Sequence, residues 1–154
     1  MAKADARELV AYDQDYHAWL SEQIGLLRAG RWRDIDVANL TDELTGLASM
    51  TKREIASRLT VLLQHLLKWQ FQPGNRSNSW RATISEQRSR INEDIADSPS
   101  LKRYPSQVLE KEYGYARLRA ADETGLPLDV FPSHCPYTVA QTLDEDFWPG
   151  GEPR

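Results

Sequence analysis

The feature that most constrains this chain is an almost unbroken apolar run from Leu59 to Phe71, which carries His65, Lys68 and Trp69 among its few polar or amphipathic side chains. On a helix, these apolar residues cover a wider arc than the single face of an ordinary surface helix. Such a helix needs neighbours on several sides. We therefore predict an all-α protein: a single bundle of about five helices around this central apolar helix, with an irregular C-terminal strap and a short final helix.

Capping residues and apolar spacing place the helices before this run. Asp13 is the expected N-cap of a helix over 14–29, which Gly30 ends, and Asp36 is the expected N-cap of the next. The sequence Thr-Lys-Arg-Glu at 51–54 has the pattern of a capping box, which favours a separate third helix up to residue 72. The same stripe of apolar residues also continues through 51–54 without Gly or Pro. One long helix is therefore an open alternative.

Prolines and glycines organise the second half of the chain. After Pro73, Asn78 or Ser79 is expected to cap a largely polar surface helix. Pro105 favours a kink at the start of the following helix, which Gly125 ends. Residues 126–137 contain three prolines, so they are expected to form a strap across the bundle, before a short helix over 138–147.

The expected core and domain limits follow from this layout. The predicted core residues of the central helix are Leu62, Leu66 and Trp69, and the strap is expected to be held by Leu128, Phe131 and Tyr137. We predict an N-terminal extension over 1–12, a single helical domain over 13–148 and a flexible tail over 149–154. A length of 154 residues suits one domain.

Charge and cysteine content exclude several classes of function. The formal net charge of −4 argues against a general binder of nucleic acid or of acidic membranes. The lone Cys135 permits no internal disulfide and fits a cytoplasmic protein. The N-terminus lacks the apolar run of a signal peptide, and the longest apolar stretch is shorter than the ~20 residues of a membrane span.

Histidine and cysteine offer few routes to catalysis. His65 could act as a general base or metal ligand in a cleft, with Glu43 the nearest acidic candidate, but an interior imidazole that ties two helices together is the favoured interpretation. No second His or Cys follows it at helical metal-pair spacing, so no metal and no cofactor is predicted. His134 and Cys135 are adjacent on an extended strap and point to opposite sides, which favours a buried thiol over a catalytic dyad.

A polar cleft can nevertheless be assembled around the central helix. Its seven candidate residues are Glu43, Arg58, His65, Trp69, Trp80, Arg81 and Arg88. The three arginines give the group surplus positive charge, which suits an anion. The alternative is that the arginines pair with carboxylates and that the tryptophans belong to the core.

Several ordered motifs resemble one bacterial family over nearly the whole chain. These motifs are Tyr12-Asp13-Gln14-Asp15, Trp19, Leu26-Leu27-Arg28-Ala29-Gly30, Asn39-Leu40, Glu43, Arg58-Leu59, His65-Leu66-Leu67-Lys68-Trp69, Gln72-Pro73, Ser79-Trp80-Arg81, Thr83-Ile84, Gln87-Arg88, Ser98-Pro99-Ser100-Leu101, Glu123-Thr124-Gly125-Leu126, Phe131-Pro132 and Cys135-Pro136. The chain resembles domain-of-unknown-function family twenty-nine. The resemblance implies a bacterial, all-helical, cytosolic protein and no established activity.

Two classes of function are therefore expected. The first is a small interaction or regulatory module that binds a protein partner or a second copy of itself, with its surface between the helix after residue 78 and the helix after residue 105. The second is a ligand- or anion-binding helical bundle, or an enzyme, that uses the polar cleft around His65. The sequence contains no complete catalytic constellation, so the catalytic residues of such an enzyme are unknown.

Overall fold

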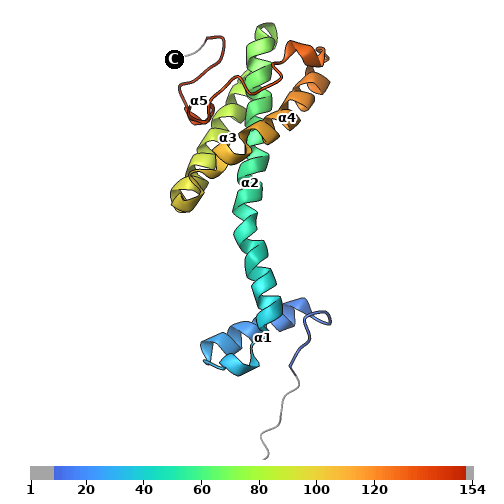
Figure 1. The fold of residues 1–154 in the computed structure, drawn as a ribbon, viewed down its shortest axis with the longest axis vertical. Coiled ribbons are helices and arrows are strands. Elements are labelled where there is room, and N and C mark those ends of the chain that lie inside the picture. The colour runs from blue at the N-terminus through green and yellow to red at the C-terminus, as the bar shows by residue number, and fades with distance from the viewer. Residues whose placement is uncertain (1–8, 152–154) are drawn as a thin grey trace, which may run out of the picture. The chain divides into compact units, whose positions relative to one another are not determined.

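The computed structural model describes residues 9–151, and in that part of the chain the protein is all-helical with five α-helices and no strand (Figure 1). The α-helices are α1 (Tyr16–Arg28), α2 (Val37–Phe71), α3 (Asn78–Asp97), α4 (Tyr104–Thr124) and α5 (Val139–Leu143). Four single 3₁₀ turns join them: η1 (Trp32–Asp34), η2 (Pro73–Asn75), η3 (Pro99–Leu101) and η4 (Leu128–Val130). The predicted all-α bundle with α2 at its centre is confirmed.

The chain divides into two compact units, the first ending at Ser49 and the second beginning at Met50. The single domain predicted for 13–148 stays a prediction. Residues 1–8 and 152–154, which make up most of the predicted extension and tail, lie outside the described residues. Of the remainder, Tyr12 is half-buried and Pro149 is buried.

Local hydrogen bonds set the ends of α1. Its N-cap is Asp15, whose side chain accepts from the Ala18 amide. The predicted cap at Asp13 is wrong. The amides of Gln14 and Asp15 both donate to the Ala11 carbonyl, so Asp13 lies in a turn that precedes α1. The predicted stop at Gly30 is confirmed by its left-handed backbone, with φ at +66°.

A single helix of 35 residues replaces the two helices favoured for residues 37–72. Asp36 begins it as predicted, because its carboxylate accepts from the Asn39 amide at 3.3 Å. The separate start at Thr51 is wrong. An N-cap needs a non-helical backbone, and without Gly or Pro nearby nothing opposes continued helix through this residue. The helix ends at Phe71, two residues before Pro73.

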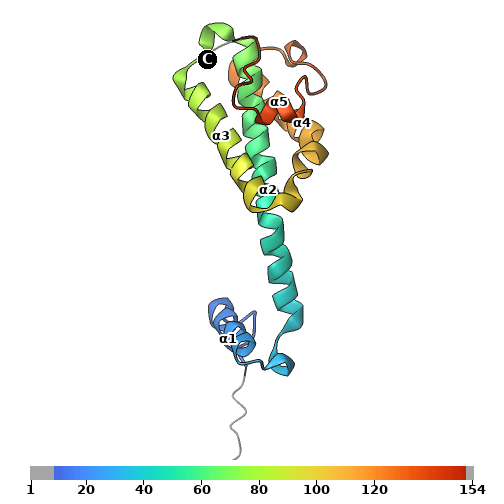
Figure 2. The same ribbon diagram turned by 90° about the vertical axis from the view of Figure 1, so that its left-hand side faces the viewer.

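The second unit contains the main hydrophobic core. α3 and α4 flank the C-terminal half of α2, and the strap with α5 crosses over this group (Figures 1 and 2). The predicted core residues Leu62, Leu66 and Trp69 are all buried there. Their main partners in the core cluster come from α3, α4 and the strap: Ile84, Ile91, Tyr113, Ala116, Ala120, Phe131 and Tyr137.

The flanking helices begin and end close to the predicted positions. Ser77 caps α3 by accepting from the Trp80 amide at 3.2 Å, so the predicted cap at residue 78 or 79 is displaced by one or two residues. Pro105 lies in the first turn of α4, where its missing N–H breaks no helical hydrogen bond. Gly125 ends α4 with φ at +68°, as predicted.

The strap is anchored by backbone carbonyls as much as by apolar contacts. Phe131 is buried, whereas Leu128 stays 38% exposed. The Tyr113 hydroxyl donates to the Pro132 carbonyl at 2.6 Å, and the Arg117 guanidinium donates to the carbonyls of Leu128 and Phe131. Paired carbonyls allow an irregular segment to lie against the bundle without unsatisfied polar groups.

Candidate functional site

The acidic member of the predicted cleft, Glu43, belongs to the first unit and has its own partners there. Its two carboxylate oxygens accept from the hydroxyls of Tyr12 at 2.6 Å and Tyr16 at 2.8 Å. These hydrogen bonds lower the pKa of the Glu43 carboxyl. They also raise the pKa of the Tyr12 phenol to about 12. Glu43 therefore acts as an anchor between the segment before α1 and α2.

His65 is half-buried on α2 and is turned toward its own helix. Its Nδ1 donates to the Val61 carbonyl at 2.8 Å. Burial is the main cause that lowers its pKa, and the nearby Lys68 ammonium adds to this effect. The imidazole is therefore neutral at pH 7, with one ring nitrogen already used in a backbone hydrogen bond.

Trp80 lies against Lys68, whose ammonium group also pairs with Glu123. The Lys68 ammonium is 4.5 Å from the centroid of the Trp80 ring and 2.6 Å from a carboxylate oxygen of Glu123. The hydrogen bond from Lys68 lowers the pKa of the Glu123 carboxyl. An aromatic face and a carboxylate together neutralise this nearly buried ammonium.

The three predicted arginines lie in different environments. Arg58 pairs with Glu54 one turn earlier on α2 and reaches Gln87 of α3 at 3.4 Å. Arg88 is fully buried, and Arg81 is exposed on α3. Arg58 and Arg88 therefore have different local partners, and the polar cleft of seven residues stays a prediction.

Arg88 serves the C-terminal segment. Its guanidinium donates to the Thr142 carbonyl at 2.9 Å and to the Phe147 carbonyl at 2.7 Å. It also lies 5.4 Å from the centroid of the Trp148 ring, which itself packs against Trp69. Burial lowers the pKa of the guanidinium to about 10, so it stays charged at neutral pH.

Metal and thiol chemistry find little support in the described chain. Within residues 9–151, no group of three His, Cys, Asp or Glu side chains is placed to hold a metal ion. Burial raises the pKa of Cys135 to about 11, and its thiol donates to the Tyr137 carbonyl at 3.4 Å. His134 is 88% exposed and lies near Glu110. The thiol is therefore protonated at neutral pH and has no histidine partner.

The first unit presents a different kind of candidate site, an uncovered apolar surface. Its small core contains Trp19, Gln23 and Leu26 of α1. Trp19 Nε1 donates to Asp36 at 3.2 Å, and Gln23 accepts from the Asp36 amide at 2.8 Å. With Tyr12 and Tyr16 on Glu43, these contacts hold α1 against the start of α2.

Large apolar side chains lie beside this small core on both helices. They are Tyr16, Ile24 and Leu27 on α1 and Val37, Leu44 and Leu47 on α2, with exposed fractions from 39% to 65%. On α1, Ile24 and Leu27 each follow a buried residue by one position. We call these six residues the apolar face of the first unit.

The spacing of this face predicted helices correctly but did not reveal what covers them. Between Val37 and Ser49, the only charged residues are Asp42 and Glu43, and Glu43 is held by the two tyrosines. The other α2 neighbours of the face are small: Ala38, Thr41, Thr45, Gly46 and Ala48. A charge-poor apolar surface is typical of the core of an interface, and this sequence signal could have identified the face.

A comparison with protein-family models identifies the family of the chain. No helix among residues 9–151 is long and apolar enough to cross a membrane. No curated protein and no solved structure matches the chain. A family model described as "Domain of unknown function DUF29" matches residues 11–148, which include all five α-helices. The chain therefore belongs to the DUF29 family.

Proposed function

We propose that this protein is a small interaction module that associates with a second copy of itself through the apolar face of the first unit. The observation that carries the proposal is the size of that face relative to the core beside it. Three buried residues of α1 support six large apolar side chains that stay exposed. Exposed apolar patches of this kind mark interaction surfaces in soluble proteins.

Helix geometry supports a single continuous face. Successive residues on an α-helix are about 100° apart around the helix axis. On α1, Ile24 is therefore offset by about 100° from buried Gln23. On α2, Leu44 is offset by the same angle, in the same sense, from Glu43. On each helix the apolar stripe thus lies beside the side that makes the contacts between α1 and α2. Two copies, face to face, bury these stripes in an interface with twofold symmetry.

The available area is compatible with a dimer. Each of the six side chains leaves roughly half of its surface exposed. Together they offer on the order of 500 Å² per copy, so two copies bury about 1,000 Å², the lower limit for a specific interface. The lack of charges on the α2 part of the face favours a copy of the same chain, because homodimer interfaces are more apolar than those between unlike partners.

Sedimentation velocity over a range of protein concentrations tests the proposal. We expect a monomer–dimer equilibrium for the natural chain and a monomer for Leu47→Asp, because a carboxylate in the middle of the face must be desolvated on association. Leu118→Asp is the matched control, since Leu118 on α4 is 53% exposed and lies in the second unit. A natural chain that stays monomeric up to about millimolar concentration contradicts self-association.

A regulatory role and a cytoplasmic location belong to the same proposal. The alternative, a ligand-binding cleft around His65, receives less support, because Lys68, Arg58 and Arg88 already have partners close by.

Loss of dimerisation in Leu47→Asp without loss of helix content, measured by circular dichroism, would separate a defect in association from a defect in folding.

A further inference from the structure

A groove of about 380 Å³ lies in the second unit between α2 and α4. Its α2 wall includes Arg53, Ser57 and Thr60, which follow one another at three- and four-residue spacing. Its α4 wall includes Lys111, Tyr115 and Arg119, which are spaced by four. Each wall is thus one polar stripe of a helix whose opposite side belongs to the core.

The floor of the groove contains a buried carboxylate. Glu112 is 6% exposed, and one of its carboxylate oxygens accepts from the Thr60 hydroxyl at 2.7 Å. Its other oxygen lies 3.9 Å from the Lys111 ammonium. The hydrogen bond and the ion pair hold this negative charge at a fixed place below the opening.

The rim of the groove is rich in cations that lack partners. Within residues 9–151, neither Arg53 nor Arg119 forms a hydrogen bond or an ion pair through its side chain. Lys52 lies next to Arg53, with its ammonium 5.5 Å from the centroid of the Tyr104 ring, which also lines the groove. Unpaired guanidinium groups on opposite walls can hold an anion by several charge-assisted hydrogen bonds.

The charges of the lining residues identify the class of ligand. Arg53, Lys111 and Arg119 contribute three positive charges and Glu112 one negative charge, which leaves an excess of two positive charges in the groove. A phosphate monoester carries nearly two negative charges at neutral pH. We propose that this groove binds a small phosphate monoester, with its phosphate at the cationic rim to which Arg53 and Arg119 both contribute.

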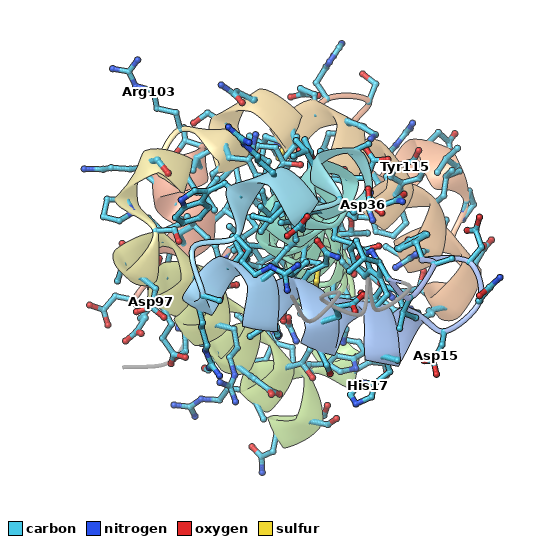
Figure 3. The ribbon with its side chains drawn as sticks, turned by 90° about the horizontal axis from the view of Figure 1, so that it is seen from below. Asp15, His17, Asp36, Asp97, Arg103 and Tyr115 are labelled. Atoms are coloured by element: carbon cyan, nitrogen blue, oxygen red, sulfur yellow. The ribbon has the colours of Figure 1, made fainter. Side chains whose placement is uncertain are left out.

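Two tyrosines favour an ester with an aromatic or other flat apolar group. Tyr104 and Tyr115 both line the groove, and Tyr115, labelled in Figure 3, is 51% exposed on α4. Exposed rings beside a cationic centre provide contact area at low entropic cost. An aromatic monoester is therefore expected to bind more tightly than inorganic phosphate.

Isothermal titration calorimetry at constant ionic strength tests the site, with inorganic phosphate and phenyl phosphate as the probes. We expect saturable binding of both, with phenyl phosphate at least threefold tighter. Arg119→Gln and Arg53→Gln should each weaken binding at least tenfold, because each removes a charged donor and keeps a polar side chain. Glu112→Gln should strengthen it, because the floor loses its negative charge.

The control variants distinguish the groove from other cationic parts of the chain. Arg28→Gln, in the first unit, and Arg81→Gln, in the predicted cleft, change the net charge equally and should leave the affinity for phenyl phosphate within twofold. Heat released equally by all variants indicates non-specific attraction and overturns the proposal. The same holds if neither probe binds to the natural chain while circular dichroism shows it folded.

Discussion

The two halves of α2 have the same helical backbone and a similar apolar period, but different surroundings. Ten residues between Ile55 and Trp69 are buried. None is buried between Val37 and Ser49, where Leu44 and Leu47 are 57% and 62% exposed. The C-terminal half is covered by α3, α4 and the strap, whereas the N-terminal half is contacted through Glu43 by Tyr12 and by Tyr16 of α1.

This difference shows what an apolar stripe does and does not specify. A repeat at three and four residues identifies a helix with one face that needs a partner. It does not say whether that partner is elsewhere in the same chain or on another molecule. For α2 the distinguishing signal is the width of the apolar arc, which is broad around Leu66 and narrow around Leu47.

The largest expected effect comes from the same substitution in each half. Leu66→Ala should lower the free energy of unfolding by about 2–5 kcal/mol, because it removes apolar contacts and leaves a cavity in a fully buried site. Leu47→Ala, in dilute solution where the chain is monomeric, should change it by less than about 0.5 kcal/mol. Urea unfolding followed by circular dichroism measures both. Equal losses in the two variants would contradict the difference between the halves.

The second effect concerns two of the arginines of α3, Arg88 and Arg81. Arg88→Met should destabilise the second unit by about 2 kcal/mol, because the Thr142 and Phe147 carbonyls lose their donors in a buried setting. Arg81→Met is the matched control, since Arg81 is exposed on the same helix. The same urea experiment applies. If both variants unfold like the natural chain, Arg88 does not anchor the C-terminal segment.

The fold was largely predictable because its strongest signals are local. The wide apolar arc located the centre of the bundle, and Gly30, Asp36 and Gly125 marked helix ends at the observed residues. The errors also have local causes. A hydrogen-bonded turn before α1 displaced the cap from Asp13 to Asp15. The residues with the capping pattern at 51–54 lie inside a continuous helix instead of starting a new one.

The candidate site was less predictable, because it depends on which faces meet. Helical spacing placed His65 and Arg58 near the border of the apolar arc, but could not show that Arg58 pairs with Glu54 of its own helix. The groove residues Lys111, Tyr115 and Arg119 form the polar stripe opposite the apolar residues of α4. That stripe becomes a candidate site only when α2 supplies Arg53 across from it.

A smaller effect distinguishes two helical glycines. Gly114 on α4 and Gly46 on α2 both have open space where a Cβ would lie. Gly114→Ala should stabilise the second unit by roughly 0.5–1 kcal/mol through helix propensity. Gly46→Ala should instead act locally, slowing hydrogen exchange of the amides around residue 46 with little change in the unfolding of the second unit. Thermal unfolding together with exchange measured by mass spectrometry distinguishes the two results.

The smallest effect is a change in how stability depends on pH. Burial lowers the pKa of His65 below its ordinary value of 6.5, so the unfolded chain binds more protons just below pH 6.5 than the folded chain does. The neutral form of His65 therefore contributes stability above about pH 6.5, and this contribution is lost as the pH falls below that value and through the lower pKa of the folded state. Urea unfolding at pH 7.5 and pH 5.5 should show a smaller loss of stability for His65→Gln than for the natural chain. His17→Gln is the control, because it also removes one histidine, and His17 is exposed on α1 in the first unit (Figure 3). An identical pH dependence in His65→Gln and the natural chain would mean that the pKa of His65 is the same in the folded second unit as it is after unfolding, which contradicts the effect of burial.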